Sequence, residues 1–117
     1  MKILIVDDAR WQRAHLVQIL TSAGHEVIQA ADGTEGLARL AEQPDAVICD
    51  LLRPNLDGFG FLAGARERGV TVPIVIASAD VQRTSRQRCM DLGARTFVAK
   101  PYQARDILDA VEMAMAA

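Results

Sequence analysis

Five short apolar runs alternate with stretches of helical periodicity along the whole chain, and this alternation limits the folds open to it. The runs are rich in β-branched residues and read KILIV (2–6), EVIQA (26–30), AVIC (46–49), PIVIA (73–77) and RTFVA (95–99). Each run has the length of a strand, and each intervening segment is long enough for a crossover helix. Strands that alternate with helices form parallel sheets, so the sequence predicts a five-stranded α/β fold.

The apolar content of each run predicts its place in the sheet. The runs at 2–6, 46–49 and 73–77 are almost continuously apolar, as is typical of strands covered by helices on both faces. The run at 26–30 is more polar and fits an edge. With right-handed crossovers, these properties predict a doubly wound parallel sheet of flavodoxin-like type, in the strand order 2-1-3-4-5, with five helices distributed over both faces.

Length and charge exclude several classes of protein. The chain has 117 residues and a net charge of -2, so we expect one domain over residues 1–117 without the broad positive field of a nucleic-acid-binding surface. No apolar run approaches the roughly 20 residues that cross a bilayer, and the first residues lack the pattern of an export signal. We therefore expect a cytoplasmic domain with neither membrane insertion nor direct nucleic-acid binding.

Three carboxylates are expected to meet at one edge of the sheet. Asp7 and Asp8 follow the first run, and Asp50 follows the third. In the order 2-1-3-4-5 the ligand crevice lies beyond the carboxyl ends of the first and third strands, where all three carboxylates would lie. Such groups repel one another unless a cation lies among them, and Mg²⁺ prefers oxygen ligands together with waters and a phosphate. The sequence therefore predicts a site for both Mg²⁺ and a phosphate group.

The other strand ends add groups suited to phosphate. Ser78 follows the fourth run and offers a neutral hydroxyl, whereas Lys100 follows the fifth and offers a compact positive charge. Each of four strand ends thus contributes a polar group to the same crevice.

These motifs, taken together and in order, resemble the receiver domain of two-component response regulators. They are VDD at 6–8, Asp50 with Pro54 and DG at 57–58, SA at 78–79, and KP at 100–101. The resemblance covers the whole chain and implies a phosphorylation switch. It implies that Asp50 accepts a phosphoryl group from a histidine kinase or a histidine phosphotransfer protein. It also implies a regulator that catalyses only its own phosphorylation and dephosphorylation.

The resemblance further assigns the metal ligands. It implies that Asp8 and Asp50 ligate Mg²⁺ directly, that Asp7 acts largely through water, and that Leu52 contributes its backbone carbonyl. Arg53 departs from the apolar residue that the family often has at this position. We interpret it as a solvated loop arginine, with modulation of the metal site or of partner docking as the alternative.

Four residues are implied at the phosphoryl group and in the switch: Ser78, Ala79, Lys100 and Phe97. Phe97 matches the family's aromatic switch position, whose ring turns inward after phosphorylation. The family then presents an altered surface of the fourth helix, fifth strand and fifth helix to a protein partner. Arginines on the fourth helix and acidic residues on the fifth suggest a homodimer across that surface as a hypothesis.

Two alternatives stay open at this level. The chain would have the same sequence if it were a receiver module cut from a larger DNA-binding response regulator. A Mg²⁺-dependent phosphohydrolase with an aspartyl nucleophile belongs to another class, but such enzymes typically have a D-x-D pair and a cap, whereas Asp7 and Asp8 are adjacent.

Two local features also have alternative interpretations. Trp11 packs at the start of the first helix or, less simply, covers part of the acidic site. Gly60 and Gly64 lie inside a predicted helix, where each glycine costs roughly 1 kcal/mol relative to alanine. That helix should therefore be either soft or closely packed against a neighbour.

Overall fold

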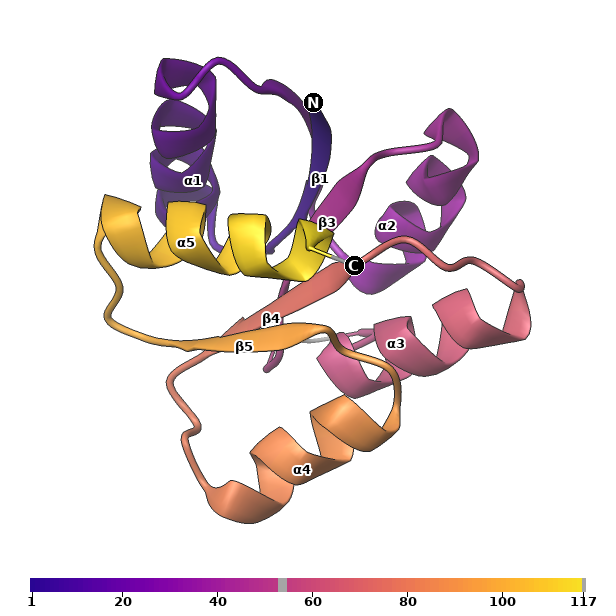
Figure 1. Ribbon diagram of the computed structural model, residues 1–117. Coiled ribbons are helices and arrows are strands. Elements are labelled where there is room, and N and C mark those ends of the chain that lie inside the picture. Colours follow the sequence, from indigo (N-terminus) through magenta and orange to yellow (C-terminus); the bar gives the residue numbers. More distant parts are fainter. Residues whose placement is uncertain (53–54, 117) are drawn as a thin grey trace.

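The computed structural model describes residues 1–52 and 55–116, and its centre is a parallel sheet in the order β2-β1-β3-β4-β5 (Figure 1). This confirms the predicted fold class and strand order. Arg53 and Pro54, on which two of the sequence interpretations rest, lie outside the described residues. The strands are β1 (Lys2–Val6), β2 (Glu26–Ala30), β3 (Ala46–Asp50), β4 (Ile74–Ser78) and β5 (Thr96–Ala99). The helices are α1 (Arg10–Ser22), α2 (Gly33–Arg39), the short 3-10 helix η1 (Leu40–Glu42), α3 (Gly58–Glu67), α4 (Arg83–Asp91) and α5 (Ala104–Met115).

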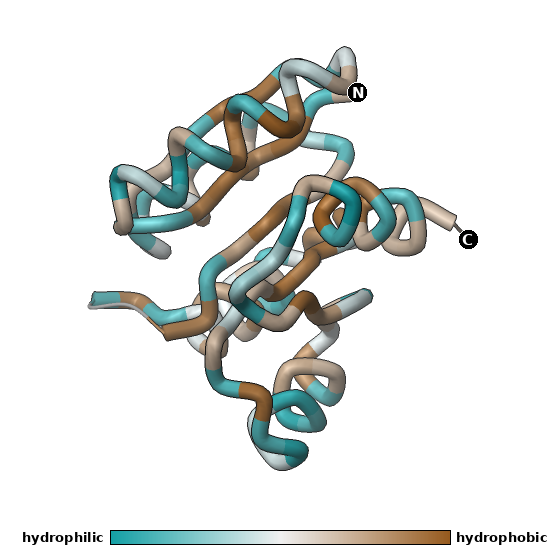
Figure 2. The backbone as a smooth tube through the Cα atoms, turned by 90° about the vertical axis from the view of Figure 1, so that its left-hand side faces the viewer, coloured by the Kyte–Doolittle hydropathy of each residue, from teal (hydrophilic) through white to brown (hydrophobic). Residues whose placement is uncertain are grey.

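The sheet separates two apolar clusters. Helices α1 and α5 cover one face, and α2, α3 and α4 cover the other (Figure 1). Because side chains alternate along a strand, Ile3 and Ile5 of β1 join the cluster under α1 and α5, whereas Leu4 and Val6 join the opposite one. Hydrophobic segments accordingly run through the interior of the molecule, with hydrophilic stretches on the helices and loops around them (Figure 2).

Four strand boundaries differ by one residue from the predicted ones, among them the end of β4, which lies at Ser78. β3 extends through Asp50, because the main chain of this residue still pairs with β4. β4 begins at Ile74 rather than Pro73, although the Pro73 carbonyl still accepts a bond from Val47 N at 3.0 Å. Proline has no N–H group, so it cannot take part as a donor in the ladder. β5 likewise begins at Thr96, one residue later than predicted.

Aspartates begin two of the helices that lead away from the sheet. Asp32 accepts a hydrogen bond from Glu35 N at 2.8 Å at the start of α2, and Asp57 accepts one from Gly60 N at 2.9 Å at the start of α3. Each carboxylate satisfies a backbone donor that has no partner inside its helix. The predicted turns before these helices are therefore N-terminal caps.

Close packing explains the glycines within α3. A Cβ atom on Gly64 would lie 2.7 Å from Leu37 Cδ1 of α2, and one on Gly60 would collide with Leu56 Cδ1. A side chain at either position would force its neighbour to move. Of the two interpretations for this helix, close packing against a neighbour is therefore the one that the structure supports.

Helix α4 is anchored differently from the others. Its single buried residue is Cys89. Two of its arginines instead lie over aromatic rings, with the Arg86 guanidinium 5.0 Å from the Phe97 ring centre of β5 and the Arg88 guanidinium 4.0 Å from that of Phe59 of α3. Cation–π contacts of this kind contribute roughly 0.5–1 kcal/mol each at exposed sites. Within the described part of the chain, no helix combines the length and apolar character needed to span a membrane.

Candidate functional site

The three predicted carboxylates meet at the carboxyl ends of β1 and β3. Candidate ligand atoms of Asp7, Asp8 and Asp50 all lie within 4.8 Å of one another. Asp7 and Asp50 are almost wholly buried, with 2 % and 7 % of the whole-residue surface exposed, whereas Asp8 is exposed. Two of the acids therefore project from the interior, and the third faces solvent at the mouth of the site.

The alternation of the strands places Asp7 and Asp50 on one face of the sheet. Ile5 and Ile48 belong to the cluster under α1 and α5, and each precedes one of these aspartates by two residues. Asp7 still follows the strand geometry, because its amide donates to Ala30 O at 3.1 Å. Side chains two residues apart in a strand point to the same side, so both carboxylates continue the apolar rows of that face.

Asp7 is held by its surroundings. Its Oδ1 accepts a bond from Ala9 N at 2.8 Å, and its backbone carbonyl accepts one from the Arg13 guanidinium at 2.6 Å. Burial raises the pKa of the Asp7 carboxyl above its ordinary value, and the negative charge of Asp50 adds to the rise, while the bond from Ala9 opposes it. The charged form of this carboxyl is therefore poorly solvated, and a cation bound nearby would stabilise it.

Lys100 reaches from β5 to the acidic group. Its Nζ donates to Asp50 Oδ1 at 2.7 Å and to Gln12 Oε1 at 2.7 Å. The side chains of the ion pair are 14 % and 8 % exposed for Lys100 and Asp50. The peptide bond from Lys100 to Pro101 is cis. Gln12 was not among the predicted site residues, because nothing in its local sequence marks a contact across 88 positions.

Three of the remaining predicted residues line a cavity of about 470 Å³ at this end of the sheet. Leu52, Ser78 and Ala79 line it together with Asp8, Asp50 and Lys100. The Ser78 side chain is buried, and its Oγ accepts a bond from Asp80 N at 3.0 Å. A hydroxyl that accepts one bond can still donate its own hydrogen to an oxygen in the cavity.

Trp11 also lines this cavity, and its interpretation as a packing residue is wrong. The indole is 88 % exposed, because α1 begins at Arg10 and directs this side chain outward at the mouth of the site. Its position agrees instead with the alternative that it covers part of the acidic site.

Phe97 lies apart from the other predicted residues. It is partly buried on β5, packs against the cluster under α2, α3 and α4, and is not part of the cavity lining. Its ring is in contact with the Arg86 guanidinium of α4. In the sheet, Phe97 pairs with Ile76 of β4, two residues before Ser78.

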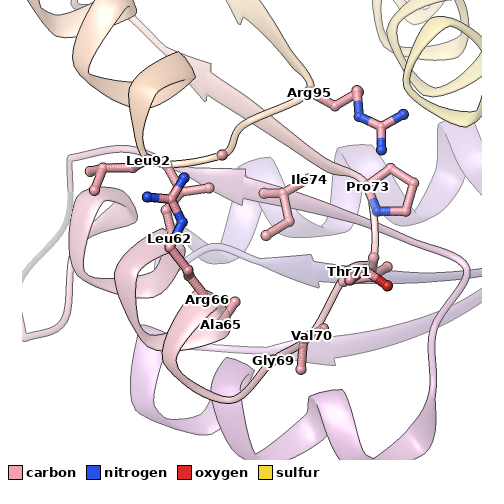
Figure 3. Close-up of a pocket in the computed structure, with 12 residues that line it drawn as sticks. Leu62, Ala65, Arg66, Gly69, Val70, Thr71, Pro73, Ile74, Leu92 and Arg95 are labelled. Atoms are coloured by element: carbon pink, nitrogen blue, oxygen red, sulfur yellow. The ribbon is translucent and has the colours of Figure 1, made fainter.

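A second cavity, of about 300 Å³, lies at the opposite end of β4 (Figure 3). Leu62, Val70, Ile74 and Leu92 contribute apolar walls, and Arg66 and Arg95 extend at its sides. The Arg66 guanidinium already donates to Asp91 O at 2.9 Å, and that of Arg95 to Ala114 O at 3.2 Å. Unlike the cavity at the acidic site, this one has no carboxylate among the described residues that line it.

Comparisons with known proteins agree with this arrangement. The family model of the response regulator receiver domain matches residues 3–112. The response regulator MprA of Mycobacterium avium (strain 104) is 35% identical over 109 residues, which are 92% of this chain and 48% of that protein. The protein-glutamate methylesterase/protein-glutamine glutaminase 6 of Anaeromyxobacter dehalogenans (strain 2CP-C) is 39% identical over 104 residues, or 86% of this chain and 29% of that protein. The chain thus spans about half the length, or less, of these two curated relatives.

Solved structures with the same fold include chemotaxis proteins. The Vibrio cholerae chemotaxis protein CheY4 superimposes with a TM-score of 0.88 at 30% identity, covering 95% of both chains. A chain of the CheX-CheY-BeF3-Mg+2 complex from Borrelia burgdorferi gives a TM-score of 0.94 at 30% identity, covering 100% of this chain and 90% of its own. The sheet order, the acidic group and the extent of these matches lead to one conclusion: the chain belongs to the response regulator receiver domain family of two-component systems.

Proposed function

We propose that this domain is a signalling switch that accepts a phosphoryl group on Asp50 in the presence of Mg²⁺. The observation that carries the proposal is the environment of Asp50. Its buried carboxylate lies beside two further acids and 2.7 Å from the Lys100 ammonium, at a cavity large enough for a phosphoryl group. A carboxylate held in this way can act as a nucleophile toward phosphorus.

The donor set of the site fits Mg²⁺. Three carboxylates and one ammonium leave an excess of two negative charges among these four groups. Hard oxygen ligands with a solvent-facing side suit Mg²⁺, which usually keeps several waters. We propose that Asp8 and Asp50 ligate the ion directly, that Asp7 acts largely through water, and that Leu52 contributes its backbone carbonyl.

In the proposed reaction, an oxygen of Asp50 forms a bond to phosphorus while the bond from phosphorus to the donor's imidazole nitrogen breaks. The departing histidine retains its electron pair and takes up a proton. In phosphoryl transfer, the protein mainly positions the reacting groups and compensates negative charge. Bound Mg²⁺ supplies part of that compensation. The Lys100 ammonium supplies the rest, and Ser78 with the backbone at Ala79 binds phosphoryl oxygens.

The proposed output is a change of surface. When Ser78 turns its hydroxyl to the phosphoryl group, the segment after β4 moves toward Asp50 and Phe97 turns inward. The surface of α4, β5 and α5 then changes for a downstream protein partner, with a second copy of the domain as one possibility to test. The donor is a histidine kinase or a histidine phosphotransfer protein. Beyond its own phosphorylation and dephosphorylation, the domain catalyses no reaction.

The proposed setting is a single receiver domain over residues 1–117 in the cytoplasm, without nucleic-acid binding by this domain. Because the curated relatives are longer, a receiver module within a larger DNA-binding regulator remains the alternative. This distinction does not alter the chemistry proposed for Asp50.

Incubation with acetyl phosphate and Mg²⁺, followed by intact-mass measurement, tests the central claim. We expect one phosphoryl adduct in the native sequence, none without Mg²⁺, and none in Asp50→Asn. Asp57→Asn is a matched control, because Asp57 caps α3 outside the acidic group and its loss should leave the adduct in place. An adduct that persists in Asp50→Asn would refute the assignment, and steady release of phosphate from small phosphate esters would favour the phosphohydrolase.

A further inference from the structure

The buried hydroxyl of Tyr102 is not explained by packing of the fold. Among the described residues, its oxygen is the one fully buried side-chain polar atom without a hydrogen-bond partner. Buried polar groups in native proteins nearly always have a partner, and an exception indicates an ordered water, an ion or a functional role. A phenylalanine would fill the same space without this cost.

The ring of Tyr102 is well held. It packs against the cluster under α1 and α5 that includes Ile5 and Ile48, and it stacks on His15 of α1 with 6.1 Å between ring centres and 11° between planes. The packing of the ring therefore fixes the position of the hydroxyl.

That position lies on the side of the sheet where the acids emerge. Ile5 and Ile48, in the cluster against which Tyr102 packs, each precede an acid of the site by two residues, so Asp7 and Asp50 lie on the same face of the sheet as this cluster. Tyr102 also follows Lys100, the partner of Asp50, by only two residues. Burial, followed by the negative charges of Asp7 and Asp50, raises the pKa of Tyr102 to about 12, which agrees with a protonated donor close to those carboxylates.

We propose that Tyr102 is a positioning residue of the metal site, whose hydroxyl donates a hydrogen bond through one water molecule to the Asp7 carboxylate. The proposal rests on the Mg²⁺ site of the proposed function. A water in this place gives the hydroxyl the partner that it lacks among the protein groups and gives Asp7 a second bond beside the one from Ala9. Two bonds fix the orientation of a carboxylate that acts on the metal, as the outer partners of metal ligands generally do.

Tyr102→Phe tests this role, since it removes the hydroxyl and keeps the ring. Mg²⁺ binding is measured by isothermal titration calorimetry without any phosphoryl donor, and circular dichroism with EDTA monitors the fold. We expect the dissociation constant for Mg²⁺ to rise about tenfold, the lower end of the range for outer partners of metal ligands. The melting temperature in EDTA should change little, because the ring packing is retained.

His15→Ala is the matched control, because it removes the stacking partner and keeps the hydroxyl. It should leave the affinity for Mg²⁺ near that of the native sequence. Equal affinities in Tyr102→Phe and the native protein would overturn the inference and leave the proposed function intact. An equal loss in His15→Ala and Tyr102→Phe would also overturn it, since ring packing would then be the cause. A native protein that takes up no Mg²⁺ would instead refute the metal site itself.

Discussion

Replacing Lys100 with methionine should lower the free energy of unfolding of the metal-free protein by more than most single substitutions near a protein surface do. The lysine and Asp50 are 14 % and 8 % exposed, and their charged atoms are 2.7 Å apart. At that separation and an effective dielectric constant of about 20, Coulomb's law gives an attraction of about 6 kcal/mol. Because desolvation of the lysine offsets part of this, and removal of one partner of a buried pair costs about 3–5 kcal/mol, we expect a loss of about 3 kcal/mol.

The assay is urea unfolding at neutral pH in EDTA, repeated with excess MgCl₂. Lys2→Met is the matched control: Lys2 Nζ also donates a 2.8 Å bond, to Glu42 O, but at an exposed site. Its loss should change the free energy of unfolding by less than about 0.5 kcal/mol. Under the proposed function, Mg²⁺ should restore part of the stability of Lys100→Met by compensating the acids.

A double substitution separates the charge effect from a packing effect. In the Asp50→Asn background, Lys100 no longer has the Asp50 carboxylate to compensate, so Lys100→Met should cost much less there than in the native sequence. A loss below about 1 kcal/mol in Lys100→Met, or strictly additive losses in the double variant, would show that Lys100 does not stabilise the protein through the charge of Asp50.

Three further outcomes are expected. The pKa of Asp7 is raised in the folded state, so ionisation of this carboxyl lowers the free energy of unfolding as the pH rises above about 4. In urea titrations with EDTA, Asp7→Asn should therefore be more stable than the native protein at pH 7, and the difference should disappear toward pH 4. Gly58→Ala would place a Cβ atom 2.8 Å from the backbone Cα of Leu51; thermal unfolding should show a loss of about 1–3 kcal/mol, and no loss would contradict the close packing. Asp32→Ala removes the cap that accepts from Glu35 N; chemical unfolding should show a loss of about 1 kcal/mol, and Asp32→Asn should restore most of it.

The strand pattern was readable from the sequence because it depends on local periodicity. Nearly continuous apolar runs identified the inner strands, and the polar run at 26–30 identified an edge. The one-residue errors at the strand ends arise where pairing depends on the neighbouring strand, as at Pro73, whose carbonyl joins the ladder although its nitrogen cannot. The convergence of Asp7 and Asp50 was predicted from the strand order, and the structure confirms both the order and the convergence.

The contacts that complete the site could not be predicted in the same way. The bond from Lys100 to Gln12 joins α1 to the end of β5, and either residue alone is unremarkable in sequence. The direction of Trp11 depends on where α1 begins relative to the site, and a shift of one residue would turn the indole by about 100° around the helix axis. The burial of the Tyr102 hydroxyl depends on the packing of α1 and α5 together.

The manner in which α4 is attached has a consequence for local opening of the native state. A helix with one buried side chain loses little apolar contact when it separates from the sheet, whereas α1 and α5 each hold several side chains in the core. Regions with few buried contacts open at a small fraction of the global unfolding free energy. Amide hydrogens of α4 should therefore exchange through a separate opening, well before those of the three inner strands, and the motion should expose the rings of Phe59 and Phe97 together.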